Sequence, residues 1–210
     1  TDHCNLSCVY CYVRKDRGGR CVEIKKEDWF EIIDQGVRMG ISSFVISGGE
    51  PLIFPGFSEI LKKLERHGSA TTVMTNLSGV AEHLISAVIE SSTVKEIVTS
   101  LDGFEGHNIA RLPSDWREVV RNIKRLKERK AAGCKVTVNT VLHNRNLGEM
   151  EKLQDLLSDL GVDIWRLDVP IKPEDLTVMP DLKKVVEIGA ILIKRRYANP
   201  HLQKAEIVMF

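Results

Sequence analysis

The sequence predicts an α/β protein whose parallel strands are covered by helices, arranged as a barrel, a part-barrel or an open doubly wound sheet. Two observations lead to this fold class. Short runs rich in β-branched residues alternate with longer amphipathic segments along the chain, as in repeated βαβ units. The chain of 210 residues, 43% of them hydrophobic, is also long enough to bury one sizeable core. In each arrangement we expect the chemistry at the carboxyl ends of the strands.

The expected elements follow one another in a regular order. Strands are predicted where β-branched residues cluster, over 43–47, 70–75, 95–101, 135–141 and 163–168. Helices are predicted where apolar residues recur at helical spacing, over 26–39, 57–67, 80–90, 115–131, 147–159 and 181–196. Glycines follow several of these helical segments, where a left-handed residue often ends a helix, at Gly40, Gly68, Gly133 and Gly161. The final residues, KAEIVMF, are typical of an edge strand.

The charge and the apolar pattern exclude several classes of partner. Thirty Lys and Arg against 29 Asp and Glu give a net charge of +1, which offers no basic surface for nucleic acid or for an anionic membrane. No apolar run approaches the roughly 18 residues of a spanning helix, and no basic-then-apolar signal opens the chain. We therefore expect a cytoplasmic protein that binds neither membrane nor nucleic acid.

Three of the five cysteines lie within the opening stretch TDHCNLSCVYC, at the spacing Cys-x3-Cys-x2-Cys. Cys4, Cys8 and Cys11 are too few and too unevenly placed for a disulfide framework, and in a reducing compartment they indicate metal ligands. One alternative is a buried face of a helix, since offsets of four and three share one side. A second is zinc, with His3 or Cys21 as a fourth ligand. The third is an iron–sulfur cubane whose fourth iron has no protein ligand.

A second motif, SGGEP, covers Ser47 to Pro51 at the predicted end of a strand. Two successive glycines let the backbone pass close to a ligand, and the Glu50 carboxylate is able to accept hydrogen bonds from an ammonium group. The alternative is that the motif is simply a turn. Its position after a strand, downstream of a three-cysteine segment, favours a binding role.

Together these motifs resemble those of the radical S-adenosylmethionine (SAM) superfamily, in which an aromatic residue, here Tyr10, precedes the last cysteine. The resemblance implies that Cys4, Cys8 and Cys11 hold a [4Fe–4S] cluster and that the amino and carboxylate groups of SAM chelate the fourth iron. Reductive cleavage of SAM then gives methionine and a 5′-deoxyadenosyl radical that abstracts a substrate hydrogen. GGEP resembles the family motif that meets the SAM amino group, which is Gly48, Gly49, Glu50 and Pro51 here.

The later strand ends carry further matches to the family. Asn76 closes MTN, which resembles the family's Thr-Asn-Gly turn with Leu77 in place of the glycine. The stretch TSLDG, followed by His107 and Arg111, resembles relatives that carry SPASM or twitch extensions. This resemblance implies that Ser100 contacts the SAM ribose region and that Arg111 meets its carboxylate; the alternatives are a strand-end turn and a solvated cation. Asn139 is expected near the adenosine unless it only satisfies backbone groups.

The resemblance implies a partial (β/α)6 barrel, TIM-like, that here lacks its first strand because the chain opens directly on the cysteine motif. We therefore expect part of a longer protein, with a core domain over 1–196 and the start of a C-terminal extension or edge strand over 197–210. No cysteine follows Cys134, so auxiliary clusters, if the protein has them, lie beyond Phe210. Asp168 or Arg166, in the sixth strand of the family order, is expected to face the substrate, with Asp168 the candidate catalytic residue.

The expected partners are an electron donor of the flavodoxin or ferredoxin type and a substrate that is a peptide, a protein or a small-molecule precursor. Two other functions remain open at this point. One is a zinc-stabilised binding module, which gives GGEP no purpose. The other is a different α/β-barrel metabolic enzyme in which the three cysteines are incidental and activity needs no iron.

Overall fold

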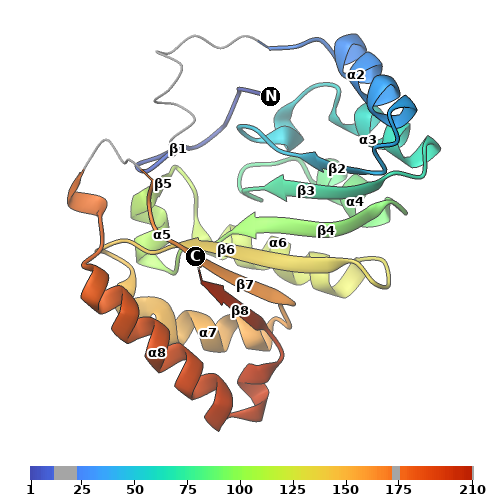
Figure 1. The fold of residues 1–210 in the computed structure, drawn as a ribbon. Coiled ribbons are helices and arrows are strands. Elements are labelled where there is room, and N and C mark those ends of the chain that lie inside the picture. The colour runs from blue at the N-terminus through green and yellow to red at the C-terminus, as the bar shows by residue number, and fades with distance from the viewer. Residues whose placement is uncertain (12–22, 172–175, 210) are drawn as a thin grey trace.

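The computed structural model describes residues 1–11, 23–171 and 176–209 and is built around one parallel sheet of six strands (Figure 1). Along the sheet the strands run in the order β2-β3-β4-β6-β7-β8. Their bounds are Ser43–Ile46, Ala70–Thr75, Val94–Ser100, Lys135–Val141, Ile164–Asp168 and Glu206–Met209. Each strand is added on the same side of the one before, without the reversal of order found in a doubly wound sheet. The sheet is therefore the wall of a part-barrel, as predicted.

Within the described ranges, six long helices link or follow the strands. They are α2 (Lys26–Arg38), α3 (Phe57–Arg66), α4 (Glu82–Glu90), α6 (Trp116–Arg129), α7 (Met150–Asp159) and α8 (Leu182–Ala198). Short 3-10 helices are η1 (Pro51–Ile53), η2 (Leu147–Glu149), η3 (Leu176–Val178) and η4 (Pro200–Gln203). Figure 1 shows α4, α6 and α7 behind the sheet, on the convex side of the part-barrel. These helices agree with the predicted segments to within a few residues.

The hydrophobic core lies between this convex side and the helices. Alternate residues of the strands, such as Ile97, Val136 and Trp165, are fully or almost fully buried there. The intervening residues point to the concave side, so each strand contributes one set of side chains to the core and another to the hollow of the barrel. The convex packing fixes the strand positions, and the strand ends in turn fix the residues that follow them.

A small second sheet lies outside these sequence-based expectations. β1 (Ser7–Cys8) and β5 (Arg111–Leu112) pair antiparallel, with Cys8 opposite Arg111, and α5 (Glu105–Ala110) precedes β5. Two-residue strands have no periodicity to detect, and this pairing joins segments that are far apart in the chain. Figure 1 places this small sheet beside the arrowheads of the main strands, which are their carboxyl ends.

β8 pairs in parallel with β7 and occupies the edge of the six-stranded sheet. The predicted boundary between a core over 1–196 and a following segment stays a prediction, because β8 adds to the same sheet whichever way the chain is divided. Among the residues that the structure describes, no helix is both long enough and apolar enough to cross a membrane.

We predict that Trp165→Ala destabilises the fold by about 3–5 kcal/mol, because the indole is 1% exposed and its removal leaves a large cavity under the helices. Its Nε1 also donates to Thr140 Oγ1 over 2.8 Å. Tyr197→Ala is the control, since Tyr197 is 74% exposed on α8 and its loss should change stability by less than about 0.5 kcal/mol. Urea unfolding of the iron-free protein, followed by circular dichroism, measures both. Equal effects would contradict this assignment of the core.

Candidate functional site

A cavity of about 410 Å³ lies at the carboxyl ends of β2, β3, β4, β6 and β7, beneath the N-terminal cysteine segment. Most of the residues that the sequence singles out line it. They are Cys4, Cys8, Tyr10, Cys11, Gly48, Gly49, Asn76, Ser100, Arg111, Asn139 and Asp168. Glu50 and Pro51 are buried and do not line it. The structure thus brings together residues from widely separated parts of the chain.

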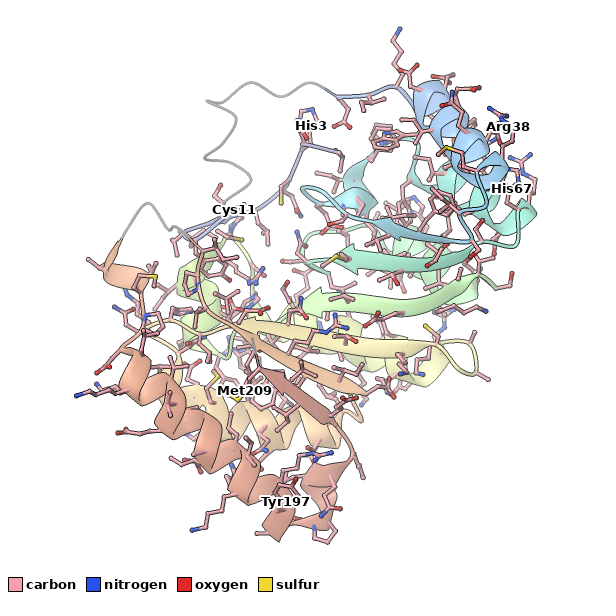
Figure 2. The ribbon with its side chains drawn as sticks, viewed as in Figure 1. His3, Cys11, Arg38, His67, Tyr197 and Met209 are labelled. Atoms are coloured by element: carbon pink, nitrogen blue, oxygen red, sulfur yellow. The ribbon has the colours of Figure 1, made fainter. Side chains whose placement is uncertain are left out.

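The cysteine segment is an extended strand followed by a turn. Val9 N–H donates to Ala110 O over 2.9 Å beside the β1–β5 pair, and Cys11 N–H donates to Cys8 O over 3.1 Å to close the turn. The three cysteines are therefore not on one face of a helix, and that reading is wrong. All three are free thiols; Cys4 is exposed and the other two are half-buried. In Figure 2 Cys11 lies at the carboxyl-end side of the sheet.

Two of the three thiols, Cys4 and Cys8, have raised pKa values. The surrounding protein removes part of the water around Cys4, which raises the pKa of this thiol although it reaches the surface. Burial raises the pKa of Cys8 to about 11, although the nearby Arg111 guanidinium opposes that shift. Metal binding must displace these protons, after which the thiolates are soft ligands of the kind that iron–sulfur clusters use.

The three thiols have the donor chemistry of iron–sulfur cluster ligands. Within the described ranges, no three His, Cys, Asp or Glu side chains converge as a single-ion site. A cubane asks something different, because each thiolate binds a separate iron around a shared space. The three free thiols lie on the wall of one cavity, and thiolates are the ligands that such a cluster uses. Of the fourth zinc ligands considered, His3 is largely exposed and Cys21 lies outside the described residues.

The two glycines of SGGEP are required by the chain's own N-terminal segment. Gly49 N–H donates to Thr1 O and Glu50 N–H donates to His3 O, each over 2.8 Å. A Cβ on Gly48 would lie 2.2 Å from Thr1 O, and one on Gly49 would lie 2.0 Å from His3 O. Gly48 also has a φ of +137°, which favours glycine. The sequence predicts that the backbone at these glycines passes close to a ligand. In the structure this backbone passes close to the segment that carries Cys4.

Glu50 is completely buried and its carboxylate is occupied by this chain. Oε1 accepts from Leu52 N–H over 3.0 Å and from the Thr75 hydroxyl over 2.7 Å, while Oε2 accepts from Asn76 N–H over 2.6 Å. Burial raises the pKa of the carboxyl, although these three donors oppose the shift. Glu50 therefore ties the end of β2 to the end of β3. Its expected contact with the SAM amino group stays a prediction.

Asn76 joins the third strand end to the cysteine segment. Its amide donates to Asn5 Oδ1 over 2.9 Å, and Asn5 donates in turn to Ser78 O over 2.6 Å. Leu77 replaces the glycine of the family turn and adopts a φ of +54°, the conformation that a glycine would supply. The Leu77 side chain is 1% exposed, so its burial offsets the backbone strain of about 1–2 kcal/mol.

Ser100 and Asn139 are register partners on β4 and β6, and both line the cavity. The Asn139 side-chain oxygen is buried and accepts from no described residue. An unpaired buried acceptor on a cavity wall is suited to a ligand that brings a donor. Asp168 lies on the same wall, and burial raises the pKa of its carboxyl against the opposing charge of Arg166.

Asp102 is the residue to which the sequence-based analysis assigned no role. It lies in TSLDG at the end of β4, is completely buried, and accepts from Arg111 Nε over 2.8 Å and from Arg111 Nη2 over 3.3 Å. The Tyr10 hydroxyl donates to the same carboxylate. Burial opposes ionisation of Asp102, yet the Arg111 guanidinium holds the pKa of this carboxyl below its usual range. Its position at a strand end, within the motif TSLDG, is the feature of the sequence from which a role for Asp102 could have been predicted.

His107 supports this strand end as a neutral side chain. Asp102 N–H donates to His107 Nδ1 over 3.2 Å, so the ring proton lies on Nε2, which is 2.9 Å from Ser114 Oγ. Burial lowers the pKa of His107 to about 4. The histidine thus braces the loop beside Arg111 and does not line the cavity.

The fold and the cavity together define a part-barrel protein with a thiol-lined cofactor site at the carboxyl ends of its strands. The sequence model of the Radical SAM superfamily matches residues 1–157. The chain therefore belongs to the radical SAM superfamily, whose enzymes use a [4Fe–4S] cluster and SAM.

Two curated relatives illustrate the similarity in sequence. The chain is 27% identical over 161 residues to a PqqA peptide cyclase of Ruegeria pomeroyi, covering 77% of this chain and 43% of the relative. It is 29% identical over 167 residues to a PqqA peptide cyclase of Streptomyces rochei, covering 78% of this chain and 44% of the relative. The chain thus spans less than half the length of these relatives.

Two crystal structures share the fold. Streptococcus suis SuiB bound to S-adenosylmethionine matches with a TM-score of 0.81 at 18% identity, over 100% of this chain and 48% of SuiB. Native anSMEcpe with bound AdoMet matches with a TM-score of 0.79 at 16% identity, over 100% of this chain and 61% of that protein.

We predict that Gly49→Ala lowers the iron content after anaerobic reconstitution to less than half of the wild-type value. The new Cβ would lie 2.0 Å from His3 O and would force the Thr1–His3 segment away, displacing Cys4 with it. Gly148→Ala is the matched control, because a Cβ there meets no atom within 4 Å. Iron and sulfide assays on both variants decide the matter. A wild-type iron content in Gly49→Ala would show that the contact between Gly49 and His3 does not hold the cysteine segment in place.

Proposed function

We propose that this chain binds a [4Fe–4S] cluster through Cys4, Cys8 and Cys11, binds SAM beside it, and cleaves SAM reductively to start a hydrogen abstraction. The observation that carries the proposal is the meeting of three free thiols with the SGGEP and SLDG strand ends on one cavity wall. The bound cluster would supply the electron that splits SAM into methionine and the 5′-deoxyadenosyl radical.

The chain's own residues hold and orient the two cofactors. The three thiolates would each bind one iron. Ser100 and Asn139 stand side by side on the wall and would hydrogen-bond the nucleoside, for which the unpaired Asn139 oxygen is available. Arg111 is buried beside Cys8 and would meet the SAM carboxylate with a guanidinium nitrogen that Asp102 does not use.

The concave wall gives the radical a shaped chamber. A primary carbon radical reacts with most C–H bonds that it meets, so its surroundings must keep water and other groups away from it. Val98 and Val141 contribute apolar surface to the cavity beside the polar groups of its rim. Asp168 lines the same wall and is the proposed substrate-facing residue.

We propose a peptide or protein as the substrate. The support comes from the relatives, because two are named PqqA peptide cyclase and SuiB also has a structure bound to the precursor peptide SuiA. A place in the subgroup whose members carry SPASM or twitch extensions belongs to the same proposal. We also propose a flavodoxin or ferredoxin as the electron donor. We propose that the protein works in the cytoplasm, where thiols stay reduced.

The first experiment measures iron, sulfide and the EPR spectrum of reconstituted, dithionite-reduced protein before and after SAM is added. We expect about four irons per chain, a signal that changes with SAM, and formation of 5′-deoxyadenosine. Cys8→Ala should abolish this cleavage, because one iron loses its ligand. Cys134→Ala is the control: Cys134 is buried just before β6, away from the cavity, and its loss should leave the cluster intact. Zinc without iron, or normal cleavage by Cys8→Ala, would overturn the cluster assignment.

The second experiment tests the substrate class through the abstracted hydrogen. Reaction mixtures contain either a pool of perdeuterated peptides or a pool of perdeuterated free amino acids, and mass spectrometry follows deuterium into 5′-deoxyadenosine. A peptide substrate predicts transfer from the peptide pool only, and no transfer in either pool with Cys8→Ala. Transfer from the free amino acids alone would contradict a peptide substrate while leaving SAM cleavage established.

A further inference from the structure

We propose that Asp102 is the positioning residue of this site, holding Arg111 and Tyr10 in fixed orientations so that SAM is bound tightly next to the cluster segment. The inference rests on the proposed function and assigns a role within the same site. Its basis is a buried polar network that joins the end of β4, the start of β5 and the cysteine segment.

The geometry of Asp102 leaves its carboxylate no freedom. Two donors come from Arg111, as Nε and Nη2 lie 2.8 and 3.3 Å from the two carboxylate oxygens. A third comes from Val141 N–H, which donates to Oδ1 over 2.9 Å, and a fourth is the Tyr10 hydroxyl. The backbone of the same residue is fixed as well, since Asn146 Nδ2 donates to Asp102 O over 2.7 Å. The carboxylate is thus a rigid anchor at the strand end.

This anchor orients the Arg111 guanidinium. Paired contacts through Nε and Nη2 hold the planar group in one direction, whereas a single contact would let it rotate. The remaining nitrogen, Nη1, donates to no described residue, and Arg111 lines the cavity. A cation held in this way offers a preset donor to an anionic group such as the SAM carboxylate.

The same anchor connects Arg111 with the cluster ligands. Tyr10, one residue before Cys11, reaches Asp102 through its hydroxyl, and the Arg111 guanidinium lies 5.4 Å from the centre of the Tyr10 ring. Arg111 is also the register partner of Cys8 in the small antiparallel sheet. One carboxylate therefore sets the position of SAM's expected partner relative to two of the three cysteines.

The charge balance explains why an aspartate is needed. Asp102 is 0% exposed and Arg111 is 8% exposed, so each charge depends on the other for its stability in the interior. Asn at this position would keep the shape and an acceptor but would leave the guanidinium without its counter-charge and without its paired contact. The cation would then turn toward other acceptors, and Nη1 would no longer be preset for a ligand.

The test compares Asp102→Asn with wild type in reconstituted, reduced protein. We expect iron content near the wild-type value, a Kd for SAM raised by at least about tenfold, and a weaker EPR change at a fixed SAM concentration. We also expect the KM for SAM to rise more than kcat falls. A merely structural Asp102 would lower the folded fraction and leave the Kd of the remaining iron-loaded protein unchanged. An unchanged Kd would therefore overturn the proposal.

Asp163→Asn is the matched control. Asp163 also pairs with a cation and a backbone N–H, accepting from Lys127 Nζ over 2.9 Å and from Val136 N–H over 2.7 Å, but at the opposite end of the sheet. Its substitution should lower the melting temperature without raising the Kd for SAM. An equal rise in Kd for the two variants would show general loosening of the fold and would also overturn the proposal.

A double-mutant cycle keeps the proposal testable if Asp102→Asn folds poorly. Tyr10→Phe removes only the hydroxyl that donates to Asp102, and Arg111→Lys keeps the charge but loses the paired contact. Each should raise the Kd for SAM, and their combination should raise it by less than the product of the separate effects. Independent effects, or none, would overturn the proposal. Wild-type protein without a SAM-responsive cluster would instead refute the proposed function.

Discussion

The site depends on one constraint: the N-terminal cysteine segment must lie directly across the carboxyl ends of the strands, close enough for backbone contact. At its start, Thr1 and His3 accept hydrogen bonds from the strand end that carries Gly49. At its end, Cys8 pairs with β5 and Tyr10 reaches Asp102. A segment held at both ends keeps its thiols on the cavity wall before any cluster is bound. The positions of the three thiols are therefore set by contacts within the chain itself.

Two buried carboxylates, Glu50 after β2 and Asp102 after β4, each link neighbouring strand ends. Glu50 ties the end of β2 to β3 by accepting from Thr75 and Asn76, and Asp102 ties the end of β4 to β6 and to the cysteine segment. An unpaired buried carboxylate would be costly, so each is surrounded by donors from neighbouring loops. The donors differ in kind. Glu50 is held by neutral groups, whereas Asp102 is held by a cation, which places a positive charge beside the thiols only at the second position.

Much of the fold and of the cavity wall could be predicted from the sequence, because strand and helix periodicity and the CxxxCxxC and GGEP motifs are local signals. The β1–β5 pair could not, since it joins Ser7 with Leu112 through two-residue strands that have no pattern. The same limit applies to the hydrogen-bond partners of individual side chains. SLDG indicated the site, but only the fold reveals that Asp102 faces Arg111 and Tyr10. Similarly, GGEP suggested an approach to a ligand, while the contact of Gly49 with His3 depends on tertiary structure.

The concave wall is graded in polarity, and this bears on where recognition occurs. Deeper in the barrel, Glu96 on β4 accepts from Arg166 over 3.0 Å and from Thr137 over 2.6 Å, so these groups satisfy one another. Arg166 is the register partner of Asn139, yet its guanidinium reaches back toward the amino end of β4 and away from the rim. At the rim, by contrast, the Asn139 oxygen has no described donor. The side chains deep in the barrel thus pair with one another, whereas the Asn139 oxygen at the rim stays unpaired among the described residues. The rim, where the proposed cofactors would bind, is therefore the part of the wall that keeps a free acceptor.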